Sequence, residues 1–251
     1  MKLAISGKGG VGKTTFSSLL IRTLNDMGKK ILAIDADPDA NLAAALGIAD
    51  AHRITPIAEM KALIMERTGA KPGTMGGFFR LNPQVDDLPD SLAVQKERIK
   101  LMRLGSVKKG GGGCLCPEST LLKALVMHIV LARDEVVVMD MEAGIEHLGR
   151  ATASAVDKLI VVVEPGRRSI ETAAHIRKLA SEIKLQQLFI VGNKVRGPKD
   201  EQFLKRHLAD FEILGFLPHA DELIEADLNG ESPYDVSSPA KERVREMVAL
   251  L

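Results

Sequence analysis

Short apolar runs recur along the chain and alternate with longer segments in which apolar residues return every three or four positions. Two of these runs, 136–139 and 159–163, contain no polar residue, which is typical of strands buried on both faces of a parallel sheet. We expect strands at 2–6, 30–34, 99–104, 135–139, 159–163, 188–191 and 213–217, and helices at 14–27, 118–132, 169–184 and 200–209. Alternating strands and helices predict an α/β fold, with a mostly parallel sheet of seven or eight strands and helices on both faces.

The stretch from residue 69 to residue 91 interrupts this alternation. It is rich in Gly, Pro and Asp, which favour turns over helices and strands. We interpret it as an insertion made of loops and one short strand at most. The sequence shows no internal repeat and no disordered linker, so we expect one domain over residues 1–251.

Composition and charge exclude some kinds of partner. The net charge of +1 implies no polyanion, and a chain with no Trp and one Tyr is poorly suited to stacking nucleic-acid bases. No apolar run approaches 18 residues, and the N-terminus shows no signal-peptide pattern. We therefore expect a cytoplasmic protein that binds neither nucleic acid nor a membrane.

The first strand is followed by a phosphate-binding motif. Gly-Lys-Gly-Gly-Val-Gly-Lys-Thr at 7–14 fits G-x-x-x-x-G-K-[ST] between a strand and a helix. Glycines let backbone N–H groups wrap phosphate oxygens, Lys13 reaches the β- and γ-phosphates, and the Thr14 hydroxyl ligates Mg²⁺. The residues expected at the nucleotide are Gly7, Lys8, Gly9, Gly10, Val11, Gly12, Lys13, Thr14 and Thr15.

A dinucleotide fold is the rival interpretation of the same loop. Gly7, Gly9 and Gly12 also match G-x-G-x-x-G, and Asp35 stands where a ribose-binding acid would lie. The following Gly-Lys-Thr favours the P-loop, because a dinucleotide loop needs neither the lysine nor the hydroxyl. A nicotinamide oxidoreductase would bind NAD without any dependence on Mg²⁺.

Acidic residues follow two of the predicted strands. Asp35, Asp37 and Asp39 come directly after the second strand, and Asp140 ends the buried run at 136–139. Residues at the carboxyl ends of parallel strands line the ligand crevice. An Asp that ends a buried strand is typical of Walker B, whose carboxylate holds Mg²⁺. Surface acids in a turn are the alternative for Asp37 and Asp39.

The lysine early in the loop resembles the deviant Walker A class of P-loop ATPases, read here as Lys-Gly-Gly-Val-Gly-Lys-Thr-Thr from Lys8. This class includes the Min-type division ATPase and the nitrogenase iron protein. The resemblance implies that Lys8 reaches across a dimer to the partner's nucleotide, as an arginine finger does. A solvated loop lysine is the alternative.

The same resemblance assigns further roles. It implies that Asp37 orients the attacking water, that Asp35 lies near the Mg²⁺ held by Thr14 and Asp140, and that the amide of Gly144 in switch II senses the γ-phosphate. An Asn after the sixth strand resembles the residue that reads adenine, although a turn-forming Asn is possible there. The residues at the base are then Asn193 and Pro218.

Two cysteines lie in a glycine-rich segment, 110–117, immediately before a predicted helix. Thiols at a helix N-terminus favour the thiolate and metal binding. Cys114 and Cys116 supply only two ligands, whereas soft-metal sites usually have about four. Two chains related by a two-fold axis would complete a four-sulfur site for Ni²⁺ or Zn²⁺. Structural cysteines, a redox pair and a bridging iron–sulfur cluster are the alternatives.

Taken with the sequence Asp-Met-Glu-Ala-Gly-Ile-Glu-His-Leu-Gly-Arg at 140–150, the Cys-Leu-Cys-Pro segment resembles the CooC-type ATPases. The resemblance runs from the P-loop to Pro218. It implies a homodimer, dependent on nucleotide and metal, that uses ATP and Mg²⁺ to insert nickel into carbon monoxide dehydrogenase or, alternatively, acetyl-CoA synthase.

A metal-free positioning ATPase of the Min/Par type is the second hypothesis. Such proteins often end in an amphipathic membrane helix, and the segment 240–251 has apolar and charged residues at helical spacing. It lacks bulky aromatic residues, so we expect it to pack on the domain instead.

Overall fold

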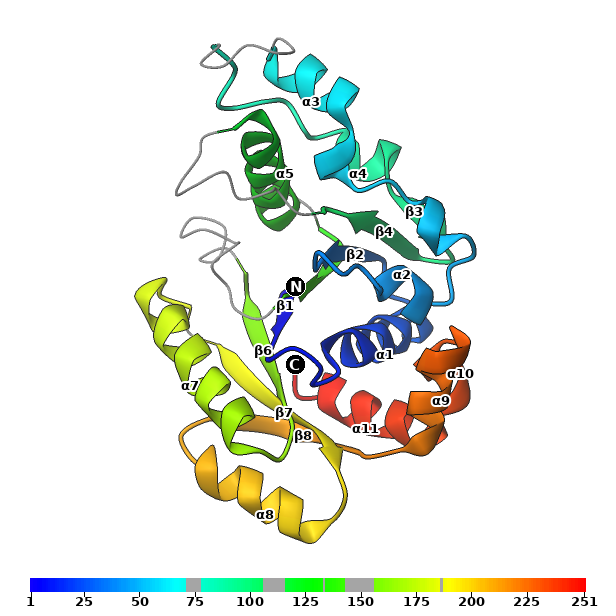
Figure 1. The fold of residues 1–251 in the computed structure, drawn as a ribbon, viewed down its shortest axis with the longest axis vertical. Helices are drawn as coiled ribbons and strands as arrows, with labels where there is room; N and C mark the ends of the chain where they lie inside the picture. Colours follow the sequence, from blue (N-terminus) through cyan, green and yellow to red (C-terminus); the bar gives the residue numbers. More distant parts are fainter. Residues whose placement is uncertain (71–77, 106–115, 133, 143–155, 186) are drawn as a thin grey trace.

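The computed structural model describes residues 1–70, 78–105, 116–132, 134–142, 156–185 and 187–251 (Figure 1). Eight strands form one sheet in the order β3-β4-β2-β5-β1-β6-β7-β8. All neighbouring strands pair in parallel except β3 and β4, which form an antiparallel hairpin. The strands are β1 (Lys2–Ser6), β2 (Ile31–Ala36), β3 (Val94–Lys96), β4 (Ile99–Arg103), β5 (Val136–Met141), β6 (Lys158–Val163), β7 (Leu188–Val195) and β8 (Glu212–Pro218).

Helices cover both faces of this sheet, as the sequence predicts. Because successive side chains of a strand point to opposite faces, the sheet contributes residues to two separate hydrophobic cores, one on each face. One core includes residues of α3, α5, α7 and α8, and the other includes residues of α1, α2, α10 and α11 (Figure 1). The helices are α1 (Lys13–Asp26), α2 (Leu42–Ala45), α3 (Lys61–Thr68), α4 (Leu88–Ser91), α5 (Pro117–Ala132), α7 (Arg167–Glu182), α8 (Pro198–His207), α9 (Asp221–Asn229), α10 (Pro233–Val236) and α11 (Ser238–Val248), with single 3₁₀ turns at Ala51–Arg53 and Ile57–Glu59.

The insertion at 69–91 differs from its prediction in one respect. Its described residues contain the short helix α4 and no strand. The unpredicted strand β3 starts three residues later and pairs with β4 through a tight connection in which Glu97 has φ +54°. Lys96 and Ile99 are register partners there, so the hairpin, rather than any apolar run, defines β3.

Four strands continue beyond their predicted ends, β8 by the single residue Pro218. β2 and β5 include Asp35 and Asp140, which are direct register partners on neighbouring strands. β7 extends through Asn193 to Val195. These polar residues therefore belong to the sheet itself and inherit its rigid spacing.

The C-terminal helix α11 packs on the domain, as predicted. Its apolar side chains Ala240, Val244 and Met247 are buried in the core shared with α1 and β8. Across the described residues, the structure contains no helix with the length and apolar character needed to cross a membrane.

Candidate functional site

The glycine-rich loop joins β1 to α1 and lies tightly against β6 and β7. Gly7 has φ +149°, and a Cβ placed on it would lie 2.3 Å from the carbonyl oxygen of Val162. Gly12 has φ +89°, and a Cβ there would lie 2.3 Å from Nδ2 of Asn193. Only glycine fits these two positions, so the loop can follow a path close enough to wrap a phosphate.

Helix α1 begins at Lys13, whose side chain is buried at the site. No described side chain caps the helix, so its first N–H groups are left for another acceptor. Amides and partial positive charge at a helix N-terminus bind phosphate oxygens. Thr14 follows in the first turn, half-buried beside Asp140.

Two buried carboxylates face this helix from the adjacent strands β2 and β5. Asp35 is 0% and Asp140 1% exposed. The Leu42 amide donates to Oδ2 of Asp35 at 3.1 Å, and the Ser17 hydroxyl donates to Oδ1 of Asp140 at 3.0 Å. The other two oxygens, Oδ1 of Asp35 and Oδ2 of Asp140, are buried with no well-formed hydrogen bond from the described residues. Buried unpaired carboxylate oxygens are what a hard cation would satisfy.

The pKa values of Asp35 and Asp140 also indicate that this carboxylate pair would be stabilised by a bound cation. Burial, reinforced by the charge of Asp140, raises the pKa of Asp35 to about 7. Burial also raises the pKa of Asp140 to about 6, against the opposing effects of hydroxyl groups and the Lys13 charge. Arg103, the register partner of Asp35 on β4, lowers the pKa of that carboxyl. These two acids and Thr14 fit Mg²⁺ bound largely through water and phosphate oxygens. Among the described residues, no three His, Cys, Asp or Glu side chains form a metal site by themselves.

Asp37 lies on the loop after β2, half-buried, and Oδ1 accepts a 3.0 Å hydrogen bond from the amide of Asp39. Its negative charge raises the pKa of Asp140, so the two carboxylates act within the same site. Asp39 is exposed. The structure therefore brings Asp37, but not the Asp39 side chain, toward the carboxylate pair.

Lys8 contacts Glu164, which in turn contacts Lys194, and the sequence indicated neither of these two residues. The Nζ of Lys8 lies 4.0 Å from Oε1 of Glu164, and Lys194 lies 3.4 Å from the other oxygen of this carboxylate. Lys194 also donates to the carbonyl oxygen of Gly10 at 2.6 Å. Charged residues directly after or at the end of apolar runs are the signal that could have indicated both.

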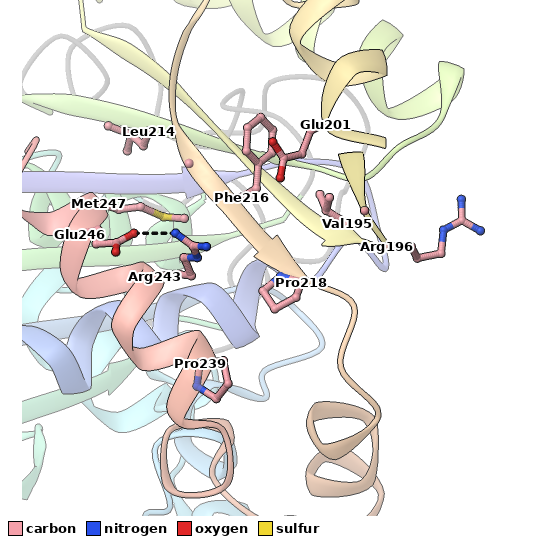
Figure 2. Close-up of a pocket in the computed structure, with 12 residues that line it drawn as sticks. Val195, Arg196, Glu201, Leu214, Phe216, Pro218, Pro239, Arg243, Glu246 and Met247 are labelled. Carbon is pink, nitrogen blue, oxygen red and sulfur yellow. Dashed lines mark hydrogen bonds and ion pairs between the residues drawn. The ribbon is translucent and has the colours of Figure 1, made fainter. Parts of the chain in front are cut away.

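The two residues predicted at the base lie at the ends of neighbouring strands. Asn193 is buried and donates from Nδ2 to the carbonyl oxygen of Val11 at 2.8 Å. Pro218 lies on the wall of an open groove of about 560 Å³ beside β8 and α11 (Figure 2). Figure 2 also shows Arg196 pointing away from the other labelled side chains. The lining residues are Val195, Arg196, Gly197, Glu201, Leu214, Gly215, Phe216, Pro218, Pro239, Arg243, Glu246 and Met247.

Cys116 is half-buried immediately before α5, and its Sγ accepts a hydrogen bond from the amide of Ser119 at 3.4 Å. The helix starts at Pro117, so the thiol lies at a helix N-terminus as predicted. Cys114 and Gly144 lie outside the described residues.

Three features define this protein as a P-loop nucleotide-binding ATPase. They are the glycine loop against β6 and β7, the lysine at the start of the following helix, and the carboxylate pair on β2 and β5. The chain belongs to the CobQ/CobB/MinD/ParA nucleotide-binding domain family, whose model matches residues 2–234.

Two curated relatives are similar over almost their whole length. The chain is 45% identical to the carbon monoxide dehydrogenase accessory protein CooC of Rhodospirillum rubrum, covering 100% of this chain and 96% of the relative. It is 42% identical to an uncharacterized ATP-binding protein of Methanocaldococcus jannaschii, covering 98% and 96% of the two chains. The predicted resemblance to CooC-type ATPases is thereby confirmed.

Solved structures show the same fold. A chain of the MinC:MinD cell division protein complex of Aquifex aeolicus aligns with a TM-score of 0.69 at 23% identity, covering 99% of this chain and 93% of that one. A ParA family ATPase from Chlorobium tepidum aligns with a TM-score of 0.72 at 16% identity, covering 100% and 98%. At these identities the likeness concerns the fold alone.

Proposed function

We propose that this ATPase uses Mg²⁺-dependent ATP hydrolysis to insert nickel into carbon monoxide dehydrogenase or a related nickel enzyme. The 45% identical relative from Rhodospirillum rubrum is a carbon monoxide dehydrogenase accessory protein, which supports this choice of client enzyme. The ATPase chemistry rests chiefly on one observation, the buried Asp35–Asp140 pair with an unpaired oxygen on each carboxylate beside Lys13.

Each residue of the phosphate site has a role in this proposal. Thr14, Asp35 and Asp140 would hold Mg²⁺, which when bound neutralises charge on the phosphates. Lys13 binds the β- and γ-phosphate oxygens from the start of α1. Asp37 orients the attacking water and accepts its proton. A negative group beside the carboxylate pair suits that task, because a positioned base favours attack in line with the leaving oxygen.

The base and the γ-phosphate sensor complete the nucleotide site. We place adenine beside Pro218, one of the residues that line the groove in Figure 2, with Asn193 between the base and the phosphate loop. Gly144 would sense the γ-phosphate through its amide. In the homodimer, Lys8 would reach the partner's nucleotide and stabilise charge on the transferring phosphoryl group.

Nickel is the cargo of the reaction in this proposal. Cys114 and Cys116 of two chains together would present four thiolates at the dimer interface, which Ni²⁺ or Zn²⁺ could occupy. Cys116 supports this arrangement because it precedes α5 and faces a helix amide. ATP binding would tighten the dimer, and hydrolysis would release the metal to the client, either carbon monoxide dehydrogenase or acetyl-CoA synthase.

Metal content against oligomeric state tests the nickel role. Reduced protein is loaded with Ni²⁺, separated by size with light scattering, and analysed for metal by mass spectrometry. We expect about half a metal ion per chain in a dimer, since one four-sulfur site serves two chains. The Cys114→Ala/Cys116→Ala variant should lose this metal. Nickel retained by that variant, or none in the wild type, would contradict the cargo role.

Phosphate release tests the ATPase separately. Lys13→Ala should abolish Mg²⁺-dependent hydrolysis, because it removes the buried charge at the β- and γ-phosphates. Lys178→Ala, which removes an exposed lysine from α7, is the matched control and should retain full turnover. Near-normal turnover in Lys13→Ala would overturn the assignment. ATP-dependent pelleting with lipid vesicles would instead favour a positioning ATPase.

A further inference from the structure

Glu164 stands between two lysines at the phosphate loop. It directly follows β6, and its amide donates to the buried Ser169 hydroxyl at 3.0 Å, which fixes its backbone against the first turn of α7. Its Oε1 lies 4.0 Å from the Nζ of Lys8 and its Oε2 lies 3.4 Å from that of Lys194. The Glu164 carboxylate thus lies between two ammonium groups and contacts each of them with a different oxygen.

Lys194 is held at the loop by a second contact. It lies in β7 with φ +56°, a left-handed conformation that non-glycine residues rarely adopt. This conformation accompanies the 2.6 Å hydrogen bond from its Nζ to the Gly10 carbonyl, next to the bond from Asn193 to Val11. Consecutive residues of β7 therefore bind two P-loop carbonyls, and Lys194 stays in place whether or not Glu164 is paired with Lys8.

Lys8 is held less firmly. Among the described residues its one acidic partner is Glu164, at the outer limit of an ion pair. Both side chains are partly exposed, 37% for Lys8 and 30% for Glu164, so water screens the attraction. Such a contact can keep the ammonium group near its own loop and still release it readily.

We propose that Glu164 is a positioning residue for Lys8, which it retains over its own P-loop until the dimer forms, and that Lys194 then neutralises the carboxylate alone. The inference rests on the proposed function, in which Lys8 crosses to the partner's nucleotide. Lys194 lowers the free-energy cost of moving Lys8 to the partner, because the Glu164 carboxylate keeps one cation beside it. Removing one partner of an ion pair is costly chiefly when the other charge stays uncompensated.

Two substitutions should shift dimer formation in opposite directions. Glu164→Gln removes the attraction that retains Lys8. We therefore expect dimers to form more readily, by about two- to fivefold for each chain and so roughly tenfold in the dimer dissociation constant. Lys194→Gln keeps a donor for the Gly10 carbonyl but removes the competing cation. Glu164 should then hold Lys8 more strongly, and the dimer should weaken by a similar factor.

Sedimentation velocity measures both effects. Wild type, Glu164→Gln, Glu164→Asp and Lys194→Gln are compared with Mg²⁺ and a non-hydrolysable ATP analogue at low and high KCl. Glu164→Asp keeps the charge but shortens the side chain, so it should lie between the wild type and Glu164→Gln, and all differences should shrink at high salt, where ion pairs are screened. If Glu164→Gln weakens the dimer or leaves it unchanged, Glu164 only supports the loop and the inference fails.

A second measurement on the nucleotide-free chain separates this inference from the proposed function. The rate of amine acetylation at Lys8, followed by mass spectrometry, should rise in Glu164→Gln, while the exposed Lys178 should react at its wild-type rate. An unchanged rate at Lys8 would show that Glu164 does not hold it. If the wild type forms no nucleotide-dependent dimer at all, the proposed function fails, and with it the transfer of Lys8, whatever the acetylation rates.

Discussion

Replacing Asp35 by Asn should stabilise the protein when nucleotide and Mg²⁺ are absent. Asp35 is fully buried, and Asp140 lies beside it as its register partner, so in the absence of Mg²⁺ two buried carboxylates repel each other, and the charges of Arg103 and Lys13 offset this only in part. Asn has nearly the same shape and can accept the Leu42 hydrogen bond through its amide oxygen. The substitution therefore removes a buried charge and keeps the local geometry.

The magnitude follows from the pKa of Asp35, which burial raises from 3.8 to about 7. A raised pKa means that stability is full below pH 4 and is lost as the pH rises toward 7, where the folded chain must ionise a group that prefers its proton. At about 1.36 kcal/mol per pKa unit, the loss is at most on the order of 4 kcal/mol. We expect Asp35→Asn to be about 1–4 kcal/mol more stable than wild type at pH 8 and nearly equal at pH 4.

Urea unfolding followed by circular dichroism, in EDTA at the two pH values, measures this difference. Asp39→Asn, which alters an exposed acid of the same loop, is the control and should change little. A gain of the same size at pH 4 and pH 8 would refute the electrostatic explanation, as would a loss at pH 8. With Mg²⁺ and ATP present the order should reverse, because the variant lacks one of the proposed magnesium carboxylates.

Two further predictions concern stability elsewhere in the chain. In urea unfolding, Gly7→Ala should destabilise the protein by about 3 kcal/mol or more, because a Cβ at Gly7 would lie 2.3 Å from the Val162 carbonyl oxygen. Gly9→Ala should cost less than about 1 kcal/mol, because a Cβ there meets no described atom within 4 Å. Equal losses in the two variants would contradict this explanation. Tyr234→Phe should lower stability by about 2 kcal/mol at pH 8, because the buried hydroxyl donates to the Asp26 carboxylate at 2.6 Å. Burial and this bond raise the pKa of Tyr234 to about 12, so the wild-type advantage should disappear between pH 10 and pH 12. A gap that stays constant over that range would show that the hydroxyl does not titrate with folding.

The sequence predicted the strands that can be recognised from an uninterrupted run of apolar residues. The runs around β5 and β6 are apolar because both faces are buried, and that burial follows from a parallel sheet. The edge strand β3 could not be found in this way. Its three residues are half-buried or exposed, and they form a strand only because the tight connection at Glu97 pairs them with β4.

At the candidate site, too, residues within short motifs could be predicted, whereas residues brought together by the order of the strands could not. Lys13 and Asp140 follow from short motifs, whereas Glu164 lies between Lys8 and Lys194 only because the sheet order places β6 beside β1 and β7 beside β6. No spacing along the chain encodes that order. Ser17 could have been predicted, since it lies one helical turn after Lys13 and so on the same face of α1.

The hydrogen bond from Ser17 to Asp140 has a mechanical consequence. It ties the second turn of α1 to β5, at a point where the helix is already joined to β1 through the glycine loop. Turning α1 about its axis, or sliding it along the sheet, would break a buried bond to a charged group, so helix, loop and central strands must move as one body. Nucleotide exchange should therefore leave the mutual arrangement of α1, the glycine loop, β1 and β5 unchanged.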